Sequence, residues 1–211
     1  MNKKILLLVI ITATLIILPF LSQERKLPDS GYPWQIELHE DGLSTVFGLT
    51  LGRTTMTEAR NIIGEGVKLA LLSTDQGDAG IEMYYGNYTA GRLSGKLIIV
   101  ADLTNDTLAG IRQRATRSGG ANSFRIYVDD LPVVMRAPIK TITFIPIVDL
   151  DKELVISRFG QPEEIIVGKD KLSHFLYPAK GLDIILDSEG KEVLQYVPPG
   201  RFQQLRAPLD T

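Results

Sequence analysis

The sequence predicts an α+β protein: an N-terminal transmembrane helix followed by two similar units, each a short helix packed on an antiparallel β-meander. Three observations support this prediction. An apolar run, residues 5–21, follows Lys3 and Lys4 near the start of the chain. A helix-like segment ending in glycine is then followed by strand-like runs separated by turn residues. Finally, this order of a helix followed by strands occurs a second time.

The apolar run predicts a membrane anchor. As a helix it is roughly 26 Å long, close to the roughly 30 Å hydrocarbon core of a bilayer. The lysines before it predict a cytoplasmic N-terminus. A cleavable signal is the alternative, although Phe20-Leu21-Ser22 fits an A-x-A-like cleavage site poorly. We therefore expect a single-pass inner-membrane protein with a periplasmic C-terminal domain.

Composition excludes several classes of function. The chain has no cysteine, which removes disulfides, thiol catalysis and the common structural zinc sites. Without residues 1–26, its basic residues fall from 23 to 19 and its acidic residues from 25 to 24, so the net charge is −5. A net acidic domain is a poor candidate for binding nucleic acid. No metal or cofactor is expected.

The first unit should begin with a hairpin at Trp34. Alternating apolar residues up to Leu38, the Asp41-Gly42 turn and a second apolar run predict two paired strands. A helix capped by Thr54 or Thr55 is expected next, before Gly64 and Gly66. Further strands are predicted over residues 81–85, 93–101 and 108–114, and a later hairpin over residues 124–128 and 131–135, with Pro132 marking an edge strand.

The second unit repeats this pattern. A helix is predicted within residues 147–160, capped by Asp149 or Asp151 and ended by Gly160-Gln161-Pro162. Strands are predicted over residues 165–167, 173–177, 182–186 and 193–197. The expected division of the chain is a membrane anchor or uncleaved signal (1–26), a linker (27–33), the first unit with flanking hairpins (34–136), the second unit (137–200) and a C-terminal tail (201–211).

Three stretches of the second unit carry a resemblance to a known family. They are the run Leu150 to Pro162, the strand His174-Phe175-Leu176-Tyr177, and the run Gly181 to Lys191. Together they resemble the BamE (SmpA/OmlA) type of small periplasmic domain, and two such units are similar to the tandem arrangement of the β-lactamase inhibitor protein. That family is attached to the outer membrane through an N-terminal cysteine, which this chain lacks. The resemblance therefore implies a fold, and not membership of the outer-membrane assembly machine.

Patterns for catalysis or metal binding are missing from the sequence. His39 and His174 lie in different units with no second histidine at metal-ligand spacing. We interpret His174 as a partly exposed sheet residue. Asp129 and Asp130 are adjacent, so in a strand they would face opposite ways and could not act as an acid and base pair. The expected protein is not an enzyme.

The strands give the stronger functional indication. Residues 97–101 and 184–186 are apolar without alternation, which predicts that both faces of the sheet are covered. One helix per unit covers one face, so the other should meet either the second unit or a partner protein. Tyrosines and a basic cluster add further candidates, the latter alternatively a solvated strand edge. The candidate interface is Tyr84, Tyr85, Tyr88, Ile98, Val100, Ile185, Arg112, Arg114 and Arg117.

We therefore expect a non-enzymatic, membrane-tethered periplasmic interaction module, an accessory or assembly subunit of an envelope membrane complex. Its expected partners are a protein and, through the N-terminal helix, the membrane. The alternatives are a periplasmic protein that binds a small ligand or lipid, and an inhibitor of an exported enzyme.

Overall fold

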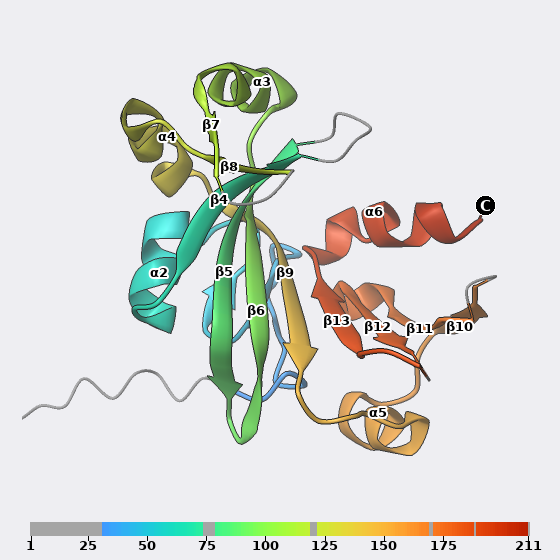
Figure 1. Ribbon diagram of the computed structural model, residues 1–211. Coiled ribbons are helices and arrows are strands. Elements are labelled where there is room, and N and C mark those ends of the chain that lie inside the picture. Colours follow the sequence, from blue (N-terminus) through green and yellow to red (C-terminus); the bar gives the residue numbers. More distant parts are fainter. Residues whose placement is uncertain (1–30, 74–78, 119–121, 169–170, 188, 211) are drawn as a thin grey trace, which may run out of the picture.

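The computed structural model describes residues 31–73, 79–118, 122–168, 171–187 and 189–210. Its strands form a ten-stranded sheet in the order β10-β11-β12-β13-β9-β6-β5-β4-β8-β7 and a small sheet in the order β1-β2-β3, and every pairing is antiparallel (Figure 1). The strands are β1 (Glu37–Leu38), β2 (Ser44–Val46), β3 (Leu49–Thr50), β4 (Lys68–Ser73), β5 (Ala79–Ala90), β6 (Leu93–Ala101), β7 (Thr116–Arg117), β8 (Ser123–Arg125), β9 (Ile139–Pro146), β10 (Glu164–Val167), β11 (Ser173–Tyr177), β12 (Leu182–Leu186) and β13 (Val193–Tyr196).

The helices of the described residues are short and lie around this sheet. The α-helices are α2 (Met56–Ile63), α3 (Asn105–Arg114), α4 (Leu131–Arg136), α5 (Lys152–Phe159) and α6 (Gln203–Arg206). The 3₁₀ turns are η1 (Val128–Asp130), η2 (Pro178–Lys180), η3 (Pro199–Arg201) and η4 (Ala207–Asp210).

The two predicted helices, α2 and α5, begin at side-chain caps. At α2 the Thr55 hydroxyl accepts a hydrogen bond from the Glu58 amide, while the Glu58 carboxylate accepts one from the Thr55 amide. At α5 the Asp151 carboxylate accepts a hydrogen bond of 2.7 Å from the Leu154 amide. Glycine ends both helices, Gly64 at α2 and Gly160 at α5, each with a positive φ. Both helix predictions are confirmed.

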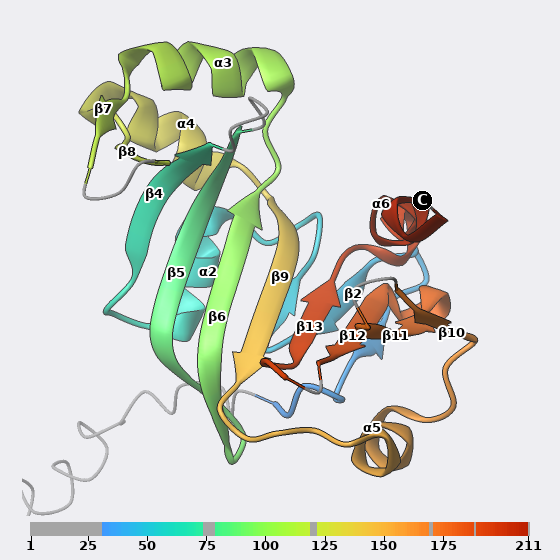
Figure 2. The same cartoon turned by 45° about the vertical axis from the view of Figure 1, so that its right-hand side comes forward.

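One face of the large sheet carries the main core. In β6, Leu97, Ile99 and Ala101 are buried, while the residues between them are half-buried or exposed. α2, α5 and the N-terminal strands pack on this covered face; Figure 2 shows α2 and those strands behind β4, β5, β6 and β9. A sheet with one covered face requires this alternation, because successive side chains point to opposite sides.

An aromatic cluster joins the middle of the sheet to the N-terminal strands. The ring of Phe47 lies 5.6 Å from those of Tyr88 and Phe144 and 5.7 Å from that of Tyr196, centroid to centroid. The Tyr196 hydroxyl, fully buried, donates a hydrogen bond of 2.9 Å to the carbonyl oxygen of Pro33. Burial raises the pKa of Tyr196 well above its ordinary value, so the phenol remains protonated as a donor. The start of the described fold is thereby attached to its last strand.

The predicted fold class is wrong in its arrangement. The fold is mostly β-sheet with several short helices, and one sheet runs across the predicted boundary between the units. The connection is β9, which pairs with β6 on one side and with β13 on the other. Because β9 supplies this shared neighbour, the two helix-and-strand repeats lie edge to edge in a single sheet.

The membrane prediction is also corrected. Within the described ranges, every helix is too short or too polar to cross a bilayer. The expected helix at residues 5–21 lies outside the described residues. The finding contradicts the predicted transmembrane helix and the single-pass inner-membrane location.

Two predicted strands are helices. Residues 108–114 belong to α3, which Thr104 caps by accepting a hydrogen bond from the Thr107 amide. Residues 131–135 belong to α4, where Pro132 stands in the first turn. Proline fits that position because the first amides of a helix have no intrahelical acceptor, whereas the sequence suggested an edge strand.

Candidate interaction surface

The open face of the large sheet is the face opposite α2 and α5. Figure 2 shows β4, β5, β6 and β9 without a helix in front of them. The apolar side chains of this face in the middle of the sheet are half-buried. We call them the open-face patch: Tyr84, Ile98, Val100, Ile145, Ile185 and Val193.

Strand register places these side chains next to one another. Tyr84 of β5 lies opposite Ile98 of β6, and Ile98 lies opposite Thr143 of β9. On β12 and β13, Ile185 and Val193 form a further direct pair. Directly opposite residues have Cβ atoms roughly 4.5–5.5 Å apart, so each pair is in contact range. The patch therefore spans five neighbouring strands, β5, β6, β9, β13 and β12, and the polar pair Thr143 and Gln195 lies on the same face between Ile98 and β12.

The C-terminal segment covers only one end of the open face. Leu176 and Val197 form a second, smaller core with Phe202, and Leu205 and Leu209 pack against it. This segment is tied to β10, since Arg206 donates two hydrogen bonds, of 2.9 and 3.1 Å, to the Glu164 carboxylate. The predicted tail therefore packs over Ile166 of β10 and Leu176 of β11, and this small core includes no residue of the patch.

A half-buried acid lies beside the patch. Glu82 of β5 sits opposite Val100 on one side and Ala70 on the other. Burial raises the pKa of the Glu82 carboxyl, because its charged form is poorly solvated between apolar neighbours. No salt bridge to Glu82 occurs within the described ranges. A partner that offered a cation or a hydrogen-bond donor here would relieve this desolvation.

A histidine and an aspartate form a second buried polar group. His174 Nδ1 and Asp183 Oδ2 are 2.8 Å apart, and the residues are 7% and 1% exposed. His174 is thus buried rather than partly exposed as predicted. Burial raises the pKa of Asp183, although the hydrogen bond and charge of His174 lower it in part. The other carboxylate oxygen, Oδ1, has no hydrogen-bond partner among the described residues.

The structure divides the predicted interface residues into three groups. Tyr84, Ile98, Val100 and Ile185 lie on the open face, the first three in adjacent strands. The tyrosine rings of residues 85 and 88 are buried on the covered face, where the Tyr85 hydroxyl donates to the Gly64 carbonyl at 3.2 Å. Burial raises the pKa of Tyr85 to about 12.

The three arginines form the third group, at the end of the sheet near α3. The guanidinium of Arg112 lies 3.5 Å from the ring centroid of Phe124, and that of Arg117 lies 5.9 Å from it. Arg114 donates to both oxygens of Asp130, at 3.0 and 2.6 Å. These intramolecular contacts occupy the arginines, and the structure does not bring them to the patch.

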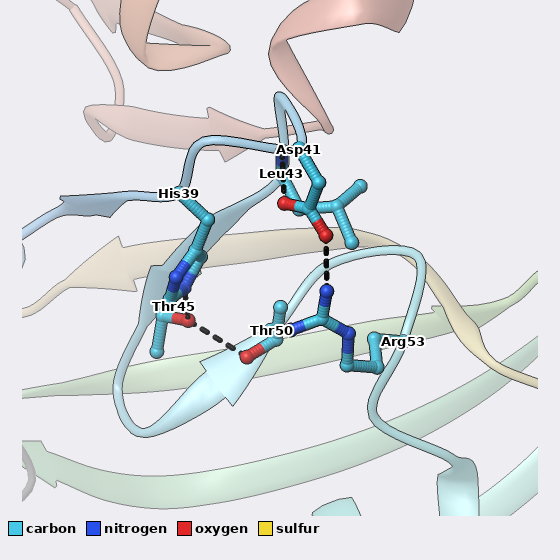
Figure 3. Close-up of polar contacts among 6 residues, drawn as sticks. All are labelled: His39, Asp41, Leu43, Thr45, Thr50 and Arg53. Carbon is cyan, nitrogen blue, oxygen red and sulfur yellow. Dashed lines mark hydrogen bonds and ion pairs between the residues drawn. The ribbon is translucent and has the colours of Figure 1, made fainter.

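His39 belongs to a polar cluster that joins the N-terminal strands (Figure 3). Its Nε2 lies 2.7 Å from the Thr45 hydroxyl, which lies 2.7 Å from the Thr50 hydroxyl. The Asp41 carboxylate instead accepts a hydrogen bond from the Leu43 amide and forms an ion pair with Arg53. Among the described residues, the hydrogen bond of His39 goes to a threonine and not to a carboxylate, and the cluster links the N-terminal strands.

Two depressions elsewhere on the molecule are weaker candidates for a binding site. An apolar crevice between Trp34, Phe144 and Phe159 has a cavity volume of about 10 Å³, far below the roughly 300 Å³ at which ligand pockets begin. A polar depression beside Asp149 and Glu192 is open to solvent. Within the described ranges, no three His, Asp or Glu side chains are arranged to hold a metal ion.

Comparison with known proteins adds no relative: no family model, curated protein or solved structure matches the chain. The resemblance to BamE-type domains therefore stays a prediction.

Several residues of this surface were not predicted from the sequence. Ile145 belongs to β9, which was not predicted even though residues 139–146 alternate between two faces. Val193 was placed in a strand without being assigned to a face. Glu82 lies inside a predicted strand, but its burial follows from neighbours on β4 and β6. The burial of Glu82 could be inferred only from the pairing of β5 with β4 and β6.

Proposed function

We propose that this protein is a non-enzymatic interaction module that binds a protein partner through the open-face patch, as an accessory or assembly subunit of a larger complex. One observation carries the proposal. Half-buried apolar side chains of five adjacent strands lie on one face of the large sheet, while the described helices α2 and α5 pack on the opposite face. Uncovered apolar surface of this kind marks interaction sites.

The arrangement of the repeats strengthens this proposal. The apolar side chains on the open face of these strands favour a cover there, either the second repeat or a partner. The repeats lie edge to edge through β9, so the second repeat does not lie over the face of the first. Among the described residues the second repeat does not cover the patch, which supports a partner protein as its cover.

The patch also indicates the chemistry of the partner. Its other residues are aliphatic, and Tyr84 at one side is an aromatic residue of the type enriched in interfaces. Glu82 beside Val100 favours a lysine, an arginine or another hydrogen-bond donor at that point of the partner. The partner should therefore present an apolar surface with a basic residue at its margin.

Site-specific cross-linking in the native cells tests this function. A photo-reactive amino acid is placed at Ile98 of the patch, at Ile185 across the sheet, and at exposed Gln113 of α3 as the control. The expected result is one common adduct from positions 98 and 185 that is absent from position 113. If positions 98 and 113 give the same set of adducts, the open-face patch is not the binding surface.

Substitutions then measure the contribution of the patch. Ile98→Thr keeps a β-branched residue in the strand, and Glu82→Lys reverses the charge expected to meet a basic residue. Each should weaken binding of the cross-linked partner at least tenfold. Glu65→Lys, an exposed acid outside the patch, is the matched control and should not change it. Equal affinity for all variants would contradict the proposal, provided that circular dichroism shows them folded.

A further inference from the structure

The two edges of the large sheet differ in their protection. At one edge β7 has only two residues, Thr116 and Arg117, and a short strand with a charge discourages further pairing. At the other edge is β10, with the sequence Glu-Ile-Ile-Val and no lysine or proline within it. Its side chains Ile165 and Val167 are 43% and 67% exposed. Figure 1 shows no helix or strand beyond β10.

In the hydrogen-bond pattern of β10, the backbone N–H and C=O groups of Ile165 and Val167 do not bond to β11. The Gly168 amide donates to the Leu172 carbonyl at 2.9 Å, which makes Gly168 a hydrogen-bonded position of the β10–β11 ladder. Such positions alternate along an antiparallel pair. Ile166 is therefore also hydrogen-bonded to β11, whereas Ile165 and Val167 direct their N–H and C=O groups away from the sheet.

This edge is complementary to itself. An antiparallel pair centred on Ile166 sets Ile165 of one copy against Val167 of the other, and the reverse, so that each pair exchanges two hydrogen bonds. The opposed side chains are apolar on both copies. The edge is also charged at its two ends, Glu163 before the strand and Lys171 after it, and neither has an ion pair among the described residues. Antiparallel pairing brings the acidic end of each copy to the basic end of the other.

We propose that β10 is a homodimer contact, at which two copies pair their β10 strands about a two-fold axis and join their sheets. The symmetric arrangement satisfies four backbone groups on each copy and covers the most exposed apolar side chain of the edge. One strand pair buries less than the roughly 1,200 Å² of a standard interface, so the dimer is weak and concentration-dependent. This contact is separate from the open-face patch and leaves it accessible.

Sedimentation velocity over a wide concentration range tests the contact. The unmodified chain should show a reversible monomer–dimer equilibrium. Val167→Lys places a charged side chain against Ile165 of the other copy and should raise the dissociation constant at least tenfold. Val167→Pro should do so by removing an outward donor that β11 does not use. Val128→Lys, at a residue 64% exposed in η1, is the matched control and should leave the equilibrium unchanged.

The predicted register has its own test, because the chain has no cysteine. Ile165→Cys mixed with Val167→Cys should form a disulfide-linked heterodimer on mild oxidation, since these positions face each other across the two-fold axis. Each variant alone should cross-link several-fold less. A chain that stays monomeric at millimolar concentration, or equal cross-linking with and without mixing, would overturn the dimer.

Discussion

The pair His174 and Asp183 shows how burial sets the behaviour of single residues. The carboxylate keeps one hydrogen bond, to the imidazole, while its second oxygen has none among the described residues. A buried charge with incomplete hydrogen bonding is costly, which is why burial dominates the raised pKa of Asp183. The Asp183 carboxyl therefore holds its proton more strongly in the folded chain than in the unfolded chain.

Asp183→Asn should consequently change stability in a pH-dependent way. A carboxyl whose folded pKa is raised contributes its stability below its unfolded pKa, near 3.8, and loses it as pH rises through the folded pKa. Asparagine does not ionise, so the stability of the variant relative to the unmodified chain should be more favourable at pH 7.5 than at pH 4. Urea unfolding at both pH values measures this difference. A difference that is constant, or that grows toward low pH, would show that the carboxyl is not destabilised by burial.

Phe159 and Leu154 on α5 provide a second comparison at this scale. Phe159 is 4% exposed and packs edge-on against Trp34, whereas Leu154 on the same helix is 36% exposed. Phe159→Ala should lower the free energy of unfolding by about 3–5 kcal/mol, through lost burial and a residual cavity. Leu154→Ala should lower it by less than about 1.5 kcal/mol. Similar losses in chemical denaturation would mean that the helix does not bury the face described.

At the scale of elements, caps and glycine turns were the reliable signals. They located α2 and α5 correctly, because a cap and a terminating glycine act within a few residues of sequence. The strands over residues 93–101, 173–177 and 182–186 were also confirmed. α3 was mistaken for a strand because the prediction began at residue 108, whereas the cap that marks the helix, Thr104, lies four residues earlier. β9 was missed although its alternation was visible.

The cap of α2 should contribute measurably. Thr55→Ala removes the acceptor for the Glu58 amide and should destabilise the protein by about 1 kcal/mol. The Thr55 amide and hydroxyl also lower the pKa of Glu58, so the cap stabilises the fold above the unfolded pKa of that acid and less as pH falls through the folded pKa. The loss in the variant should therefore be larger at pH 7 than at pH 3.5. A loss independent of pH would show that the hydrogen bond from the Thr55 hydroxyl to the Glu58 carboxylate does not contribute to the cap.

Two glycines test the importance of close backbone packing. Gly181 and Gly42 both have positive φ, which costs other residues roughly 1–2 kcal/mol. A Cβ at Gly181 would lie 2.0 Å from the Val197 carbonyl oxygen, whereas a Cβ at Gly42 meets nothing within 4 Å. Gly181→Ala should therefore destabilise by at least about 2 kcal/mol more than Gly42→Ala. Equal melting temperatures for the two variants would contradict the close approach of η2 to the residues after β13.

For the whole molecule, the shared sheet predicts cooperative unfolding. The repeats have a common strand neighbour in β9 and a common aromatic cluster around Phe47. Fluorescence of Trp34, which contacts α5, and circular dichroism of the sheet should give coincident urea transitions. Phe144→Ala should lower both midpoints together, with a loss of about 3–5 kcal/mol. Separate transitions would mean that the repeats fold independently.

The arrangement of the whole was the least predictable part. The repeated pattern was visible in sequence, but whether two repeats stack face to face or join edge to edge depends on long-range pairing such as Leu194 with Phe144. The same holds for the candidate surface. Its apolar strands were recognised, while the separation of Tyr84 from Tyr85 required knowing which face the helices cover.

The position of β13 has a consequence for synthesis of the protein. Val193–Tyr196 comes last among the strands in sequence but lies inside the sheet, between β12 and β9. Until β13 has been synthesised, β9 and β12 each lack the neighbouring strand on one side. The Tyr196 hydroxyl, which bonds to Pro33, is also still missing. The native structure therefore closes only after translation has passed Tyr196, and until then two unpaired strand margins are exposed to chaperones and to other nascent chains.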